Sequence, residues 1–291
     1  MLSGKYVVSG CFAALLGVMA GPALAGGGGG GNGGNCNFFQ GWSTLKSDLK
    51  GSVRITGNGG LGNNMWATIV DNSGIVCAVA FSGTDFTSQW LGSRVISAQK
   101  ANTGNSFSLG LNAGGTVIAL SSANLFSAVQ PGGSLYGLQA SNPVDADVAY
   151  GEGPGNSPPA NASSFGTPQD PMVGQRIGGI NVFGGGLALY KGGVRVGGVG
   201  VSGDTSCTDH MVAWRTRHAL GLDQFGSGVS GVAGGAFPDN IIFDIRANPD
   251  GSGSAGPFPY TAGDVGHSTS GFGHPTCLTP PTLSTLPPVA Q

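Results

Sequence analysis

Charged residues are scarce in this chain. Only 9% of its 291 residues are Asp, Glu, Lys or Arg, and the formal net charge is −2. Proteins that bind nucleic acids or anionic lipids do so largely through clustered Lys and Arg side chains. The chain has 12 such residues and an acidic balance. We therefore predict no nucleic-acid partner.

The chain also has no collagen-like repeat, although it contains 57 glycines. A collagen triple helix needs glycine at every third position, and no such period is present. Hydrophobic residues make up 40% of the chain, which is enough for a core. The length fits one large domain, or one domain with long extensions.

Long apolar runs are also lacking. The apolar run near the N-terminus is too short to span a membrane comfortably. It extends from Cys11 to Ala20, after Lys5 and before the small-residue sequence Ala23-Leu24-Ala25. This pattern is typical of a secretory signal peptide over residues 1–25. Residues 26–35, rich in glycine, are then a flexible linker. We predict an exported protein, periplasmic or secreted, with no membrane span in its mature form.

Export changes what the cysteines indicate. Cys11 belongs to the leader, which leaves Cys36, Cys77, Cys207 and Cys277. An even number of cysteines in an oxidising compartment predicts two disulfides, with three possible connectivities. Buried free thiols are the alternative.

Hydrophobic periodicity and turn residues predict an α+β domain with an antiparallel sheet. Helices are expected at 38–53, 88–107, 121–129 and about 204–220; strands are expected at 65–70, 75–81, 180–190, 194–203 and, as an edge strand, 239–245. We expect a domain over 36–223, interrupted by a loop insertion at about 142–170. An irregular Gly/Pro-rich extension over 224–291 is expected to pack on it.

The segment "GVSGDTSCTDHMVAWRTRHAL" at 200–220 combines helix-capping residues with a mixed apolar face. Four residues share the face that we expect to point into the core: Cys207, Met211, Trp214 and His218. His210 lies on a neighbouring face, with Trp214 and Arg217. Of the four histidines, His210 is the one that we predict to be functional.

Two short motifs place cysteine and histidine at matching spacings. "CTDH" contains Cys207 and His210, and "HPTC" contains His274 and Cys277. Together they form the ligand set of a structural zinc site. Because thiols oxidise outside the cytoplasm, we favour a Cys207–Cys277 disulfide over zinc, with Cys36–Cys77 as the second bond. This pairing would bring His210 and His274 together as a candidate ligand pair for a metal.

No catalytic constellation is recognisable in the sequence. "GVSGD" departs from a nucleophile elbow because Asp204 replaces its second glycine, so Ser202 is expected in a strand-to-helix turn. An enzyme acting on a small metabolite stays open as an alternative, with Asp209, His210 or Arg217 in its site.

Four segments resemble the GlcG/HbpS-like haem-binding proteins, a family also described as a haem-degrading domain. They are "ATIVDNSGIVCAVAFSG", "SRVISAQKANTGNSF", "VQPGGSLYGLQASNPV" and "INVFGGGLALYKGGVRVGGVGVSGDTSCTDHMVAWRTRHALGLD". The resemblance covers about residues 53–223. It implies a profilin-like, three-layer α/β/α arrangement with a five-stranded antiparallel sheet. It also implies self-association into a homo-oligomer.

The resemblance further implies that the protein binds haem or another small ligand. His210 and His274 are then the expected iron ligands, and Asp209, Trp214 and Arg217 the expected neighbours of the cofactor. Aromatic residues that could form the apolar slot are Trp66, Phe81, Trp90, Phe107, Phe126, Phe183 and Trp214. The chain has no CxxCH motif, which excludes covalently attached c-type haem. The alternative function is an exported structural protein that self-assembles.

Overall fold

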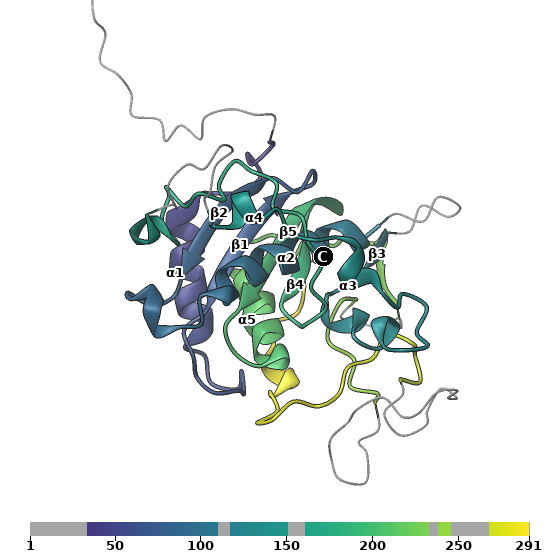
Figure 1. Ribbon diagram of the computed structural model, residues 1–291. Coiled ribbons are helices and arrows are strands. Elements are labelled where there is room, and N and C mark those ends of the chain that lie inside the picture. Colours follow the sequence, from purple (N-terminus) through teal and green to yellow (C-terminus); the bar gives the residue numbers. More distant parts are fainter. Residues whose placement is uncertain (1–33, 110–116, 151–160, 233–237, 246–267, 291) are drawn as a thin grey trace, which may run out of the picture. The chain divides into compact units, whose positions relative to one another are not determined.

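The computed structural model describes residues 34–109, 117–150, 161–232, 238–245 and 268–290 (Figure 1). The predicted signal peptide and most of the predicted glycine linker lie outside these residues. Across the described ranges, none of the helices combines the length and the apolar character that a bilayer crossing needs.

The main sheet has four antiparallel strands in the order β2-β1-β5-β4. Their bounds are Trp66–Asp71 for β1, Val76–Phe81 for β2, Gly186–Lys191 for β4 and Val194–Ser202 for β5. The prediction of a fifth strand in this sheet is wrong, because the described residues form only four. Strand β3 (Val117–Ala119) instead pairs in parallel with β6 (Val229–Gly231) as a separate sheet. The extension after residue 223 thus supplies β3 with its partner.

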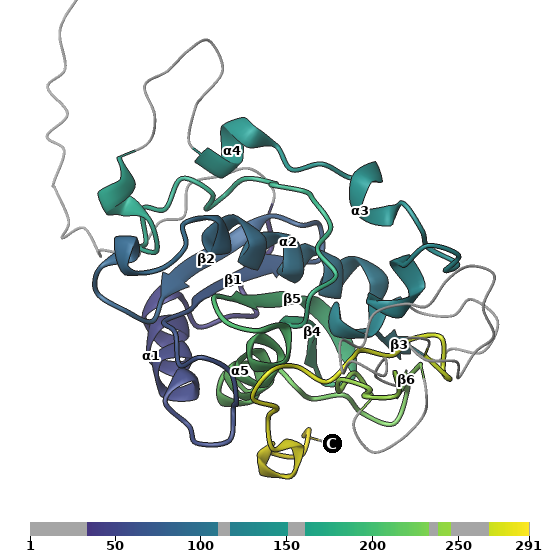
Figure 2. The same cartoon turned by 60° about the horizontal axis from the view of Figure 1, so that its bottom comes forward.

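Helices cover both faces of the main sheet (Figure 2). Helix α2 (Gly92–Phe107) packs on β1, β4 and β5, whereas α5 (Ser206–Ala219) and α1 (Trp42–Val53) contact each other and cover the opposite face. Shorter pieces are α3 (Leu138–Ser141), α4 (Ala146–Tyr150) and 3-10 turns at Phe86–Ser88, Ala123–Leu125, Ser127–Val129, Ala162–Ser164 and Leu283–Thr285. The predicted three-layer α+β organisation is present.

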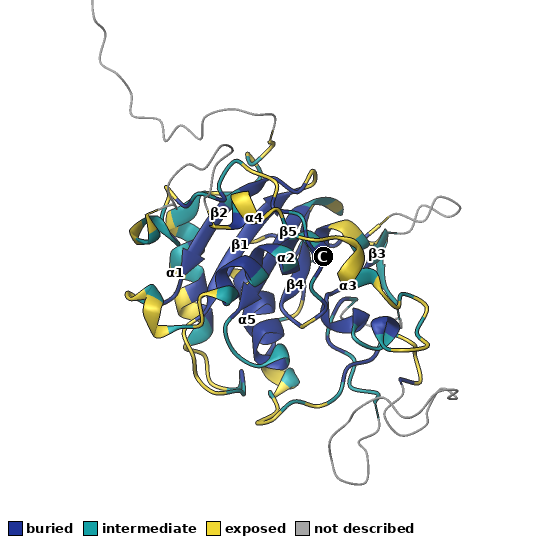
Figure 3. Cartoon of the chain, in the orientation of Figure 1, coloured by how far each residue is buried: buried dark blue, intermediate teal, exposed yellow. Residues whose placement is uncertain are grey.

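The central strands are buried on both faces (Figure 3). In β1, Ala67 and Ile69 pack with α1 and α5, whereas Trp66 and Val70 pack with α2. Successive side chains of a strand point to opposite faces, so a strand covered on both sides needs apolar residues at almost every position.

Glycine allows α2 to lie close to the sheet. A Cβ atom on Gly200 would lie 1.9 Å from the carbonyl oxygen of Ser97, and one on Gly198 would lie 2.3 Å from that of Ala101. Real Cβ atoms do not approach backbone this closely. These two positions of β5 therefore require glycine for helix–sheet contact.

Several predicted elements also differ in their bounds or type. The strand predicted at 180–190 begins only at Gly186, as β4, and the helix predicted at 38–53 begins only at Trp42. Helix α2 begins only at Gly92, so Trp90, inside the helix predicted over 88–107, precedes it and is 67% exposed. The segment 121–129 forms two 3-10 turns, not one helix. The segment 239–245 forms no strand, and only Ile245 makes an isolated bridge, to Ser268.

Candidate functional site

Two disulfides are present, Cys36–Cys77 and Cys207–Cys277, as predicted. The second joins the start of α5 to the C-terminal segment, and His274 lies beside it. The side-chain ligand atoms of Cys207, His274 and Cys277 lie within 4.8 Å of one another. Sulfurs joined to each other are not thiolate ligands, so a zinc clamp and this disulfide exclude each other.

Loss of the Cys207–Cys277 bond should destabilise the protein. We expect the double variant Cys207→Ser/Cys277→Ser to lose about 2–5 kcal/mol of unfolding free energy, because the unfolded chain is no longer cross-linked. Urea unfolding of the purified protein measures this. The matched control Cys36→Ser/Cys77→Ser opens a loop with a sequence separation of 41 instead of 70, so it should lose less on chain entropy. An unchanged urea midpoint in the first variant would contradict the prediction.

His210, the histidine predicted to be functional, is completely buried. Its Nε2 lies 3.2 Å from the backbone nitrogen of Ile241 and 3.3 Å from Oδ1 of Asn240. Its Nδ1 is buried and has no hydrogen-bond partner among the described residues. Burial, with a smaller effect of the Arg217 charge, lowers the pKa of His210 to about 3. The imidazole is therefore neutral near pH 7.

His274 is also buried, and both of its ring nitrogens are hydrogen-bonded. Nδ1 donates to the carbonyl oxygen of Pro275 at 2.6 Å, and Nε2 lies 2.7 Å from Oγ of Ser206. Burial lowers the pKa of His274 to about 4. Ligation of iron by this ring would require one of these hydrogen bonds to break.

The other predicted cofactor neighbours belong to buried contacts. Asp209 accepts a hydrogen bond from Lys100 Nζ at 2.6 Å, and burial raises the pKa of Asp209 to about 6. Arg217 forms a two-point ion pair with Asp239. Trp214 donates from Nε1 to the carbonyl oxygen of Pro287 at 2.9 Å.

The partners Lys100 and Asp239 escaped the sequence analysis. Lys100 lies 109 positions before Asp209, and Asp239 lies in the predicted irregular extension, 22 positions after Arg217. Neither separation follows a helix or strand period. The only available signal was the scarcity of charge, which makes each charged residue in an apolar segment a candidate for a buried pair.

The predicted aromatic slot does not form as one unit. Trp66 and Phe81 pack against each other between the sheet and α2, with ring centroids 4.6 Å apart. Trp214 lies on the opposite face of the sheet. Phe183 and Trp90 are exposed, at 51% and 67%. The aromatic residues thus serve different parts of the fold.

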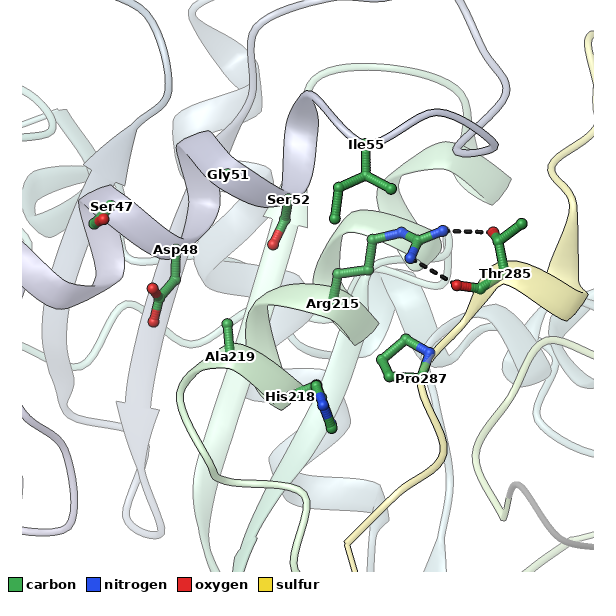
Figure 4. Close-up of a pocket in the computed structure, with 10 residues that line it drawn as sticks. All are labelled: Ser47, Asp48, Gly51, Ser52, Ile55, Arg215, His218, Ala219, Thr285 and Pro287. Carbon is green, nitrogen blue, oxygen red and sulfur yellow. Dashed lines mark hydrogen bonds between the residues drawn. The ribbon is translucent and has the colours of Figure 1, made fainter.

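A pocket of about 590 Å³ lies between α1 and α5 (Figure 4). Three segments line it. Helix α1 and the residues after it contribute Ser47, Asp48, Gly51, Ser52 and Ile55; α5 contributes Arg215, His218 and Ala219; the C-terminal segment contributes Thr285 and Pro287. Its volume falls within the range of about 300–1,000 Å³ that is usual for small-molecule sites. None of the three pockets described in this structure is lined by His210 or His274.

His218 is the histidine that lines this pocket. Its side chain is 44% exposed, and its Nδ1 lies 2.7 Å from Oδ2 of the buried Asp223. Among the described residues, Nε2 makes no hydrogen bond. A carboxylate that binds one nitrogen of an imidazole fixes the ring and its tautomer, and leaves the other nitrogen as a metal ligand. The geometry thus provides one oriented histidine nitrogen beside the pocket.

Sequence reasoning predicted His218 to face the core, together with Cys207, Met211 and Trp214. The other three are buried, whereas the side chain of His218, in the last turn of α5, is 44% exposed. An available signal was "HALGLD", in which Gly221 ends the helix and returns the chain so that Asp223 reaches His218.

Arg215 forms another wall of the pocket and is held from two sides. Its Nε donates to Oδ1 of Asn58 at 2.9 Å, and its Nη atoms donate to the backbone and side-chain oxygens of Thr285 at 2.9 and 2.6 Å (Figure 4). Asn58 in turn donates to the carbonyl oxygen of Ser52 near the end of α1. A guanidinium has five N–H hydrogens, and three of them are used in these contacts, so two have no partner among the described residues and are left for an anionic group of a ligand.

Asp48 lines the pocket from α1. Its Oδ2 is buried and has no hydrogen-bond partner among the described residues, and burial raises the pKa of this carboxyl group. A buried polar atom without a partner costs roughly 1–3 kcal/mol, so a donor on a ligand would be favoured there. The pocket therefore combines a histidine, an arginine and a carboxyl group with the apolar side chains of Ile55 and Pro287.

Three solved structures are similar to this chain. PduOC in complex with haem has 20% identity and a TM-score of 0.38, covering 61% of this chain and 90% of that one. The protein ORFY of Klebsiella pneumoniae has 22% identity, a TM-score of 0.36 and coverages of 62% and 88%. A double mutant of HbpS from Streptomyces reticuli has 14% identity, a TM-score of 0.38 and coverages of 69% and 98%. Identities this low transfer neither ligands nor residue roles.

No curated protein matches the chain. The family model of the haem-degrading protein HbpS-like matches residues 56–217, which is more than half of the chain. This match confirms the resemblance that the sequence motifs predicted. The chain belongs to the family of HbpS-like haem-degrading proteins.

Proposed function

We propose that the protein binds haem in the pocket between α1 and α5, with His218 as the iron ligand. The observation that carries this proposal is the pairing of His218 Nδ1 with Asp223, which leaves Nε2 available at a pocket of about 590 Å³. Family membership makes haem the first ligand to test. Haem, when bound, would supply the redox chemistry of its iron.

The residues around the pocket match the parts of a haem. A neutral imidazole nitrogen is a common axial ligand, and an apolar surface accommodates the porphyrin. Arg215 offers N–H groups to the propionates, and its hydrogen bonds to Asn58 and Thr285 hold the guanidinium in place. Ile55, 44% exposed, and Pro287 supply apolar contact.

The pair His210 and His274, expected from the sequence as iron ligands, is a competing proposal. Burial of both rings and the hydrogen bonds of His274 count against it on physical grounds. Both proposals predict a haem-binding protein, and they differ in the residue that holds the iron. Mutagenesis separates them.

Haemin titration followed by the Soret band tests the proposal. We expect a saturable Soret shift in the natural protein, loss of the iron–imidazole spectrum in His218→Ala, and its recovery when imidazole is added. Asp223→Asn should weaken haem binding by about 10- to 100-fold, because the Asp223 carboxylate orients the His218 ring without touching the iron. His210→Ala serves as the control variant.

Two outcomes would overturn the assignment. A shift that persists in His218→Ala and disappears in His274→Ala or His210→Ala would place the iron at the pair predicted from the sequence. No saturable shift in the natural protein would exclude haem. Clean self-association on a sizing column in that case would favour the structural alternative.

Export is part of the same proposal. Two disulfides fit an oxidising compartment, where they persist, and the leader-like residues 1–25 fit a secretory signal. Fractionation of cells that produce the full chain, with N-terminal sequencing of the product, tests cleavage after Ala25.

A further inference from the structure

A second pocket, of about 300 Å³, is lined by the first half of α2, the end of β5 and the start of α5. It lies away from the haem pocket and shares none of its lining residues. Nothing in the proposed haem function uses this pocket.

The buried pair Lys100–Asp209 lines this second pocket. Lys100 is completely buried and donates to Oδ2 of Asp209 at 2.6 Å and to the carbonyl oxygen of Val201 at 3.2 Å. An ammonium group carries three hydrogens, and these are the only two hydrogen bonds that Nζ of Lys100 makes among the described residues. One N–H of Lys100 is left for a further acceptor.

Ser93 lies about two helical turns before Lys100 on the same side of α2 and lines the same pocket. The residue is 1% exposed, and its Oγ is buried without a hydrogen-bond partner among the described residues. A buried hydroxyl without a partner costs roughly 1–3 kcal/mol. Ser93 and Lys100 thus offer a hydroxyl and an N–H group to an oxygen atom of a ligand.

Large apolar side chains line the pocket although they are exposed to solvent. Trp90 is 67% exposed, Phe183 51% and Leu61 64%. Single exposed apolar residues are common on protein surfaces, but three at one pocket that also holds buried polar groups are typical of a ligand site. They offer flat contact area to the body of a ligand.

The charges at the pocket are compensated within the protein. Lys100 and Asp209 neutralise each other. The carboxylate of Asp204 accepts hydrogen bonds from the backbone N–H groups of Leu61 and Asn63, at 2.9 and 3.0 Å. An anionic ligand would meet the charge of Asp204, and a cationic ligand would meet that of Lys100. Both would also lose hydration on binding.

We infer that this pocket is a second binding site, for a small uncharged molecule with a flat apolar body and a hydroxyl or carbonyl oxygen at one end. The oxygen reaches Ser93 Oγ and the remaining N–H of Lys100. The body packs against Trp90 and Phe183.

Phenol is the probe for this site, with benzoate and benzylamine as its anionic and cationic counterparts and toluene as the counterpart without oxygen. Saturation-transfer NMR on the full chain should show saturable binding of phenol and weaker binding of the other three. Ser93→Ala should weaken phenol binding by about three- to tenfold, the effect of one hydrogen bond. Phe183→Ala should also weaken it.

Two controls make the test specific. Tyr136 is 68% exposed and does not line the pocket, so Tyr136→Ala should leave phenol binding unchanged. His218→Ala should leave it unchanged as well, and Ser93→Ala should leave the haemin titration unchanged, so the two sites fail independently. Phenol binding that is equal in Ser93→Ala, in Phe183→Ala and in the natural protein would overturn the inference, as would benzoate binding as tight as that of phenol.

Discussion

Replacing Asp239 with alanine is expected to lower the free energy of unfolding by about 3–5 kcal/mol. Arg217 and Asp239 are both completely buried, and two of the guanidinium nitrogens bind the two carboxylate oxygens. Without the carboxylate, a guanidinium charge is left inside the core. Its central carbon lies 4.7 Å from the ring centroid of Trp214 and 4.9 Å from that of Phe225. This loss is a large part of the stability of a typical domain.

Urea unfolding of Asp239→Ala and of Arg217→Met measures the loss. The double variant Arg217→Met/Asp239→Leu is the decisive control, because it removes both charges and leaves no unpaired ion. It should be more stable than either single variant, since apolar residues often replace a buried ion pair at little cost. If the double variant loses as much unfolding free energy as the two single variants together, packing at these positions determines the effect, and charge pairing does not.

Acidification below pH 6.5 is expected to destabilise the protein well before its carboxylates with low pKa values titrate. His210 and His274 have folded pKa values of about 3 and 4, below the ordinary value of 6.5. As the pH falls through 6.5, these rings take up a proton in the unfolded chain but not in the folded protein. Each such histidine removes about 1.4 kcal/mol of stability per pH unit until its folded pKa is reached.

Asp209 acts in the opposite direction. Its folded pKa is raised to about 6, above the ordinary value of 3.8 for an aspartate, so between these two values the folded state holds a proton that the unfolded chain has lost. Its contribution to stability therefore increases as the pH falls from 6 to 3.8. Set against Asp209 alone, the two histidines leave a net loss of about 1.4 kcal/mol per pH unit between pH 6 and 4. Asp48, whose pKa burial also raises, acts in the same direction as Asp209.

Urea unfolding at pH 7, 6, 5 and 4 gives this slope directly. His210→Gln and His274→Gln should each flatten it, and the double variant should leave the opposing slope of the carboxyl groups with raised pKa values, Asp209 and Asp48. An unchanged slope in the double variant would show that these two rings do not titrate differently in the folded and unfolded states.

The sequence identified several elements because their patterns are local. Strands β1 and β2 flank a turn of favourable residues. The predicted bounds 65–70 differ from β1 by one residue at each end, and the predicted bounds 75–81 differ from β2 by one residue at the start. Helix α5 begins where Asp204, Thr205 and Ser206 predicted it, with Thr205 as its cap. Such signals depend on the backbone hydrogen bonds of a few neighbouring residues.

The predicted iron ligands show where local patterns end. The spacing of "CTDH" and "HPTC" correctly paired Cys207 with Cys277 and placed His274 beside them. It did not indicate that His210 and His274 would be buried, or that His218 would line a pocket. Exposure depends on which segments cover a helix, and that is a property of packing.

By itself, the sequence determined the family, the two disulfides and the α+β class, because each follows from composition, motifs or short-range periodicity. The signal peptide follows from the same kind of local pattern and stays a prediction. Only the tertiary structure decided that Lys100 meets Asp209, that Arg217 meets Asp239, and that α1, α5 and the C-terminal segment enclose a pocket beside His218. Charge pairs and pockets join residues that are distant in the chain, and their positions are fixed by how helices pack on the sheet. No local pattern records that packing.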